Sequence, residues 1–141
     1  MKKILIVDDI SENRYVLAGF IKLLSKTKIE IVEANSGESG YNKTIEEKPD
    51  LILMDIKMET DEAGLETVRK IRHLEEFKDT QIWAITAFAM EESTYGEGDK
   101  TRCLAAGCND YITKPYNPVE FLIKISNLFS IPLPKSLIKH F

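Results

Sequence analysis

Five short runs of apolar, mostly β-branched residues occur along the chain, at positions 4–7, 29–32, 51–54, 82–85 and 111–113. Most of them lack the apolar and polar alternation of a strand that has one face in water. Continuous runs of this kind predict strands that are covered on both faces, as in a parallel sheet between two layers of helices.

Helical spacing fills the segments between these runs. The clearest stripe lies in 11–26, where Ser11 is the expected N-cap and the inward positions are Val16, Leu17, Phe20, Ile21 and Leu24. Further helices are predicted at about 37–47 and 64–76, before Gly107, and from Asn117 onward. Five strands that alternate with five helices predict an α/β fold with a doubly wound five-stranded parallel sheet.

The length, charge and cysteine content of the chain limit the number of domains and exclude several classes of function. A chain of 141 residues forms one domain, and a net charge of -4 with a pI near 5.3 gives no basic footprint for direct nucleic-acid binding. The N-terminal apolar run is too short for a signal peptide or a membrane span. Cys103 and Cys108 fit neither a disulfide framework nor a zinc motif and are expected to be reduced thiols. We therefore expect a cytoplasmic protein with a domain at 1–130 and a short C-terminal tail at 131–141.

Polar residues stand directly after four of the five predicted strands: Asp8, Asp9, Asp55, Thr86 and Lys114. Each one alone would be interpreted as a helix cap or a solvated charge. Ligands of open parallel sheets bind outside the carboxyl ends of the strands, so the residues are expected to meet there. Three carboxylates at one edge would repel one another unless a hard cation such as Mg²⁺ neutralised them.

This set contains the parts of a phosphoryl-transfer site. Asp55 beside a divalent cation can act as a nucleophile toward a phosphoryl group. The hydroxyl of Thr86 and the ammonium of Lys114 are then available as donors to the phosphoryl oxygens.

Four segments, at 7–9, 53–55, 84–87 and 111–115, together resemble the receiver domain of bacterial response regulators over about residues 3–129. The resemblance implies a flavodoxin-like fold and a small Ala87 that leaves access to the site. It also implies a cis Lys114–Pro115 bond, and a switch in which Thr86 moves toward the phosphoryl group while Tyr111 turns inward. Tyr111 as an ordinary half-buried sheet residue is the alternative. The implied site residues are the phosphoacceptor Asp55, the phosphoryl-reading Thr86 and Lys114, and the Mg²⁺ ligands Asp8, Asp9, Asp55 and the main-chain carbonyl of Lys57.

Two segments depart from the family pattern. The loop at 57–64 lacks the usual proline and is one residue longer, and its acidic residues Glu59, Asp61 and Glu62 are expected to form a solvated face, with one near the metal as the alternative. The stretch at 91–100 is an insertion that either serves a partner or is merely tolerated. Phe88 is expected to hinder the water that removes the phosphoryl group.

The leading hypothesis is a phosphorelay component that accepts a phosphoryl group from a histidine kinase or a histidine-phosphotransfer protein and signals to an unknown downstream protein. Ile10 and Asn13 are candidates for docking the phosphodonor. The chain is either a stand-alone regulator, which the initial Met1 favours, or a receiver from a hybrid kinase. A dehalogenase-like phosphohydrolase is disfavoured because Asp8 and Asp9 are adjacent instead of two residues apart. The complete set of site residues disfavours a metal-free interaction module.

Overall fold

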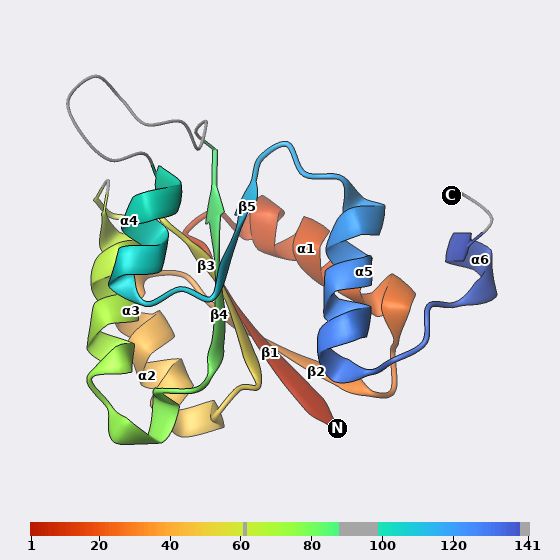
Figure 1. Ribbon diagram of the computed structural model, residues 1–141, viewed down its shortest axis with the longest axis horizontal. Helices are drawn as coiled ribbons and strands as arrows, with labels where there is room; N and C mark the ends of the chain where they lie inside the picture. Colours follow the sequence, from red (N-terminus) through yellow and green to blue (C-terminus); the bar gives the residue numbers. More distant parts are fainter. Residues whose placement is uncertain (61, 88–98, 139–141) are drawn as a thin grey trace.

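Five parallel strands form one sheet in the order β2-β1-β3-β4-β5 (Figure 1). The computed structural model describes residues 1–60, 62–87 and 99–138. The strands are β1 (Lys2–Val7), β2 (Ile29–Ala34), β3 (Leu51–Asp55), β4 (Gln81–Thr86) and β5 (Asp110–Thr113). The predicted doubly wound five-stranded parallel sheet, with its flavodoxin-like receiver topology, is therefore confirmed.

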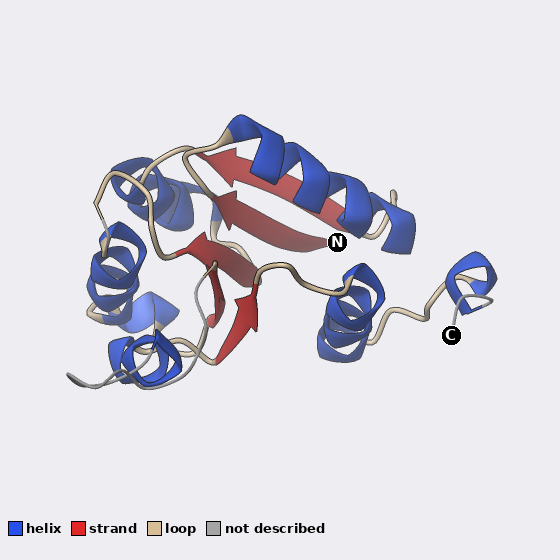
Figure 2. Ribbon diagram, turned by 90° about the horizontal axis from the view of Figure 1, so that it is seen from above, coloured by secondary structure: helices blue, strands red, loops and turns tan. Residues whose placement is uncertain are grey.

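Helices cover both faces of this sheet (Figures 1 and 2). α1 (Ser11–Leu24) and α5 (Pro118–Phe129) pack on one face, whereas α2 (Gly37–Glu47), α3 (Ala63–Arg72) and α4 (Asp99–Ala106) pack on the other. A 3-10 helix, η1 (Glu75–Phe77), follows α3. The continuous apolar runs have this cause: every residue of β3 is buried, because helices lie above and below it.

The two faces have separate hydrophobic cores. The first core lies between the sheet and the α1 and α5 layer, and it includes Ile21, Phe121 and Trp83, which is the only tryptophan of the sequence. Trp83 is 4% exposed, and the ammonium of Lys124 lies 5.2 Å from the centroid of its ring. The second core lies under α2, α3 and α4 and includes Leu65 and Val68 of α3.

The predicted start of the first helix was wrong by one residue. Ile10 occupies the N-cap position and makes no side-chain cap bond, and Ser11 is the first helical residue. The turn into α1 is instead closed by Asp8, whose Oδ1 accepts a hydrogen bond of 2.9 Å from the backbone N–H of Ile10. α5 begins as predicted, since Asn117 accepts hydrogen bonds from two backbone N–H groups of its first turn and Pro118 follows.

The chain beyond α5 contains a sixth helix, α6 (Lys135–Ile138), which the sequence did not predict. Ile131 is 7% exposed, and the half-buried side chains of Leu133 and Leu137 pack against the first core. The described part of the tail therefore contacts the domain. Across 1–60, 62–87 and 99–138, no helix has the length and apolar character needed to cross a bilayer.

Candidate functional site

The three predicted carboxylates meet at the carboxyl edge of the sheet. Asp8 and Asp9 follow β1, and Asp55 is the last residue of β3, which lies beside β1 with Val7 opposite Met54. One oxygen atom from each of the three carboxylates lies within 4.8 Å of the other two. Asp8 and Asp55 are 2% and 7% exposed, while Asp9 is exposed. Adjacent parallel strands thus bring together residues that are 46 or more positions apart in the sequence.

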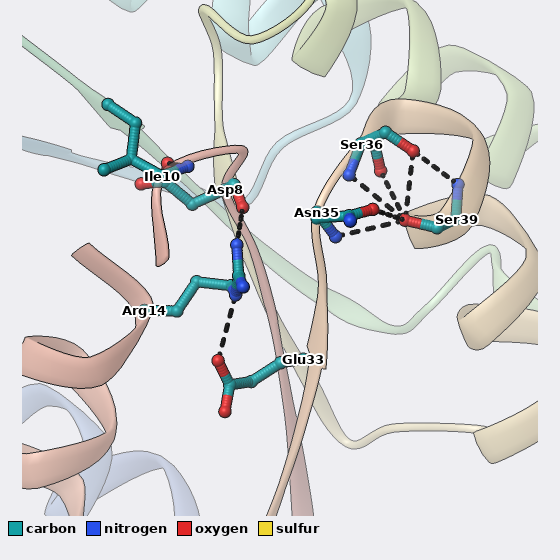
Figure 3. Close-up of polar contacts among 7 residues, drawn as sticks. All are labelled: Asp8, Ile10, Arg14, Glu33, Asn35, Ser36 and Ser39. Atoms are coloured by element: carbon teal, nitrogen blue, oxygen red, sulfur yellow. Dashed lines mark hydrogen bonds and ion pairs between the residues drawn. The ribbon is translucent and has the colours of Figure 1, made fainter. Parts of the chain in front are cut away.

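Arg14 fixes the acidic loop from the first turn of α1 (Figure 3). Its Nη1 donates a hydrogen bond of 2.7 Å to the main-chain carbonyl of Asp8, and its Nε donates one of 2.9 Å to Glu33 at the end of β2. The guanidinium therefore ties β1, β2 and α1 together next to the site. Sequence reasoning missed Arg14. The available signal was a basic residue one helical turn after an acidic pair, a position from which a long side chain can reach back.

Burial is the main cause that raises the pKa of Asp55 to about 7, and the neighbouring charges of Asp8 and Asp9 raise it further. Two groups oppose this effect: the Lys114 ammonium, and the backbone N–H of Lys57, which donates a hydrogen bond to the Asp55 carboxylate. The negative charges of Asp8 and Asp9 thus disfavour the charged form of Asp55. A cation that replaced part of the lost hydration would relieve that repulsion.

Lys114 reaches the cluster from the end of β5. Its Nζ lies 3.7 Å from Oδ2 of Asp8, and its backbone N–H donates a hydrogen bond of 2.7 Å to the carbonyl of Thr86. The peptide bond between Lys114 and Pro115 is cis, as the family resemblance implied. The Lys114 ammonium therefore lies beside the buried carboxylate of Asp8, at the carboxyl ends of the strands.

Thr86 ends β4, the strand next to β3, and it is 1% exposed. Tyr111 on β5 is half-buried and packs against the second core, with the ammonium of Lys100 at 5.4 Å from its ring centroid. Thr86 thus lies on the strand beside β3, and Tyr111 lies on the edge strand one position further from the acidic cluster. Ala87 is exposed, and Phe88 and residues 91–98 lie outside the described part of the chain.

The loop after β3 is held by more contacts than the sequence suggested. Both carboxylate oxygens of Glu59 accept from the backbone N–H of Gly37 at 3.1 Å, and Glu62 forms an ion pair with Arg102 of α4. The expected solvated face is therefore only partly correct: Glu59 is exposed and Glu62 is partly exposed, yet each has a defined partner. Among the described residues, the acidic cluster contains neither of them, and Asp61 lies outside those residues.

Gly64 closes this loop directly behind Asp55. Its backbone N–H donates a hydrogen bond of 2.9 Å to the carbonyl of Ile56. A Cβ atom at this position would lie 2.1 Å from the carbonyl oxygen of Asp55, so only glycine permits the approach. The loop length thus sets how closely α3 can begin behind the acidic cluster.

The chain is thus a doubly wound α/β domain with acidic residues and a lysine at the carboxyl edge of its sheet, the edge at which open parallel sheets bind their ligands. The chain belongs to the response regulator receiver domain family, whose family model matches residues 4–126. Members of this family act in two-component signalling, and receiver domains bind Mg²⁺ at an acidic pocket.

Relatives and solved structures agree with this assignment. The chain is 32% identical over 126 residues to the polar-differentiation response regulator DivK of Brucella ovis, which covers 89% of the chain and 94% of that protein. It is similar to the chemotaxis protein CheY4 of Vibrio cholerae, with a TM-score of 0.74 and 26% identity; the match covers 91% of this chain and 98% of the CheY4 chain. It is also similar to the receiver domain of a sensor histidine kinase of Pseudomonas aeruginosa, with a TM-score of 0.76 and 27% identity; the match covers 92% of this chain and 98% of that domain. That structure has a magnesium ion coordinated in the active-site cleft.

Proposed function

We propose that Asp55 accepts a phosphoryl group from the phosphohistidine of a histidine kinase or a histidine-phosphotransfer protein. The observation that carries this proposal is the convergence of Asp8, Asp9 and Asp55 within 4.8 Å, with the Lys114 ammonium 3.7 Å from Asp8. In this arrangement Asp8 and Asp9 offer carboxylate ligands for a metal ion, and Asp55 offers a carboxylate nucleophile. The Lys114 ammonium is placed to neutralise negative charge on the phosphoryl group.

The chemistry of the transfer follows from these positions. A carboxylate oxygen of Asp55 forms a bond to phosphorus while the bond between phosphorus and the donor imidazole nitrogen breaks, and the imidazole leaves. The Lys114 ammonium and the Thr86 hydroxyl donate hydrogen bonds to phosphoryl oxygens, and the backbone N–H of Lys57 already donates to the Asp55 carboxylate. The buried position of Asp55 limits access of water to the acyl phosphate that forms.

The acidic cluster fits Mg²⁺ by its donor chemistry. All of its side-chain donors are carboxylate oxygens, and two ligands of one Mg²⁺ ion lie at most about 4.2 Å apart, so separations within 4.8 Å need only small rotations. Asp8, Asp9 and Asp55 would hold the ion, together with the main-chain carbonyl of Lys57. When bound, Mg²⁺ offsets the repulsion between the carboxylates and the phosphoryl oxygens.

Residues beside the site are placed to bind the phosphodonor and to pass the signal to a downstream protein. Ile10 is 49% exposed at the start of α1, next to Asp9, and Asn13 is partly exposed one turn later, which supports their role in docking the phosphodonor in the cytoplasm. Thr86 and Tyr111 are the proposed switch pair, since Thr86 lies beside the site and Tyr111 packs under the α4 face. The signal then passes to a downstream protein by contact.

Incubation with acetyl phosphate and Mg²⁺, followed by intact mass measurement, tests the proposal. The expected result is one added phosphoryl group on the wild-type protein and none on Asp55→Asn. Glu46→Gln, which neutralises an exposed carboxylate of α2, is the matched control and should be labelled like the wild type. Absence of label on the wild type, or equal labelling of Asp55→Asn, contradicts the assignment. Rapid turnover of a phosphomonoester would indicate a phosphohydrolase instead.

A further inference from the structure

The loop between β3 and α3 has to hold its backbone in place without proline or glycine at positions 56–60 and 62. Two backbone groups of this loop form hydrogen bonds next to Asp55. The N–H of Lys57 donates to the Asp55 carboxylate, and the carbonyl of Ile56 accepts a hydrogen bond from the N–H of Gly64. The position of Lys57 therefore depends on whatever fixes the loop on its far side, beyond Met58.

Glu59 provides that fixed point. Its two carboxylate oxygens each lie 3.1 Å from the backbone nitrogen of Gly37, the first residue of α2. A carboxylate is favoured here because the N-terminus of a helix carries unpaired N–H groups and a partial positive charge. The two residues are 22 positions apart in the sequence, and their contact joins the loop after β3 to the N-terminus of α2.

The receiving end of this contact, the start of α2, is held by several interactions of its own. Ser36 and Ser39 form a reciprocal capping box, in which each side chain accepts a hydrogen bond from the backbone N–H of the other, as Figure 3 shows. The packing around Gly37 is also tight: a Cβ atom there would lie 2.5 Å from Oγ1 of Thr67 and 3.5 Å from a carboxylate oxygen of Glu59. The start of α2 is thus held against α3 and can serve as an anchor.

We infer that Glu59 is a positioning residue: by binding the start of α2 it holds the main chain of Lys57 against Asp55. This inference rests on the proposed function of Asp55 for its meaning, but its structural part concerns only Glu59, Gly37 and Lys57. The loop is then fixed at two points, by Gly64 behind Asp55 and by Glu59 at the start of α2. Glu59 is not one of the three carboxylates of the acidic cluster.

The experiment separates the reach of the carboxylate from its charge. Glu59→Ala removes the acceptor, Glu59→Asp keeps the charge but withdraws it by one methylene, and Glu59→Gln keeps an acceptor oxygen at full length. Glu38→Ala is the matched control, because Glu38 is an exposed acidic residue in the first turn of the same helix. The first measurement is the ¹⁵N and ¹H chemical shift of the Lys57 amide in metal-free protein.

The Ala and Asp variants are expected to move the Lys57 amide signal, whereas the Gln variant and Glu38→Ala leave it near its wild-type position. The dissociation constant for Mg²⁺, measured by calorimetry, should rise about tenfold in the Ala and Asp variants, as for other residues that orient a ligand from behind. The phosphorylation rate with acetyl phosphate at saturating Mg²⁺ should stay close to that of the wild type.

The results distinguish this inference from the proposed function. An unmoved Lys57 signal together with an unchanged Mg²⁺ dissociation constant in Glu59→Asp overturns the inference, even if the wild type takes up its phosphoryl group normally. A wild type that takes up no phosphoryl group overturns the proposed function, while the amide shifts still decide the role of Glu59. If Glu59→Ala does not fold, the contrast between the Asp and Gln variants decides in the same way.

Discussion

Replacing Asp55 by asparagine is expected to stabilise the folded protein above neutral pH when no divalent cation is present. The Asp55 carboxyl group has a pKa near 7 in the folded state and 3.8 in its ordinary state, mainly because the carboxylate is buried. Since each pKa step of one corresponds to about 1.4 kcal/mol, ionising Asp55 at pH 8 costs the folded state on the order of 4 kcal/mol. The asparagine side chain avoids this cost because its amide stays neutral.

The sign of the pH dependence follows from proton linkage. Below pH 3.8 the carboxyl group is protonated in both states, and the variant and the wild type should be about equally stable. As pH rises from about 4 to 7, the unfolded chain gives up the proton while the folded protein keeps it, so the wild type loses stability. Above pH 7 the difference is constant, and we expect a net advantage of about 2–4 kcal/mol for the variant, because water that reaches the cluster beside the exposed Asp9 screens part of the cost.

Urea denaturation of both proteins from pH 4 to pH 8 in the presence of EDTA measures this difference. The control is Glu46→Gln, which neutralises an exposed carboxylate and should show no trend relative to the wild type. A difference between Asp55→Asn and the wild type that does not change with pH, or a less stable variant at pH 8, would refute the reasoning. Adding Mg²⁺ should then stabilise the wild type more than the variant, because a ligand that binds only the folded state raises its stability.

Three further predictions concern packing and hydrogen bonding. Gly64→Ala should lower the free energy of unfolding by more than about 3 kcal/mol, because its Cβ would lie 2.1 Å from the Asp55 carbonyl; a loss below about 1 kcal/mol in urea denaturation would contradict this. Arg14→Ala should cost about 1–3 kcal/mol by the same assay and weaken Mg²⁺ binding, since the Asp8 carbonyl loses its donor; unchanged Mg²⁺ affinity would argue against a role in holding the loop. Leu137→Ala should cost about 1 kcal/mol if α6 stays packed on the first core, and an unchanged melting temperature would indicate that the contact adds no stability.

The fold and the acidic cluster could be predicted because they depend on patterns that are local in sequence. Each strand of a doubly wound sheet is buried on both faces, so its apolar run is visible without knowledge of its neighbours. The topology then places the end of every parallel strand at one edge, which is why Asp8, Asp55 and Thr86 come together. The strands run slightly further than predicted, so that Asp55 and Thr86 are the last residues of β3 and β4 rather than the first residues of loops.

The supporting contacts could not be predicted because they join segments whose distance is set only by the folded structure. Arg14 reaches Glu33 across 19 positions, and Glu59 reaches Gly37 across 22. The expected cap at Ser11 failed for a related reason: the carboxylate of Asp8, needed at the site, also closes the turn that leads into α1. A residue that serves two purposes is difficult to recognise from a rule about either one.

The position of Trp83 gives this protein an optical probe of one layer only. Its indole ring belongs to the core under α1 and α5, so its fluorescence follows loss of packing on that face and is silent about α2, α3 and α4. Far-ultraviolet circular dichroism, in contrast, responds to the helices of both layers. Superimposed unfolding curves from the two signals would show that the layers melt as one cooperative unit. Curves that separate would show that one face of the sheet can loosen while the other stays folded, and the order of the two transitions would identify that face.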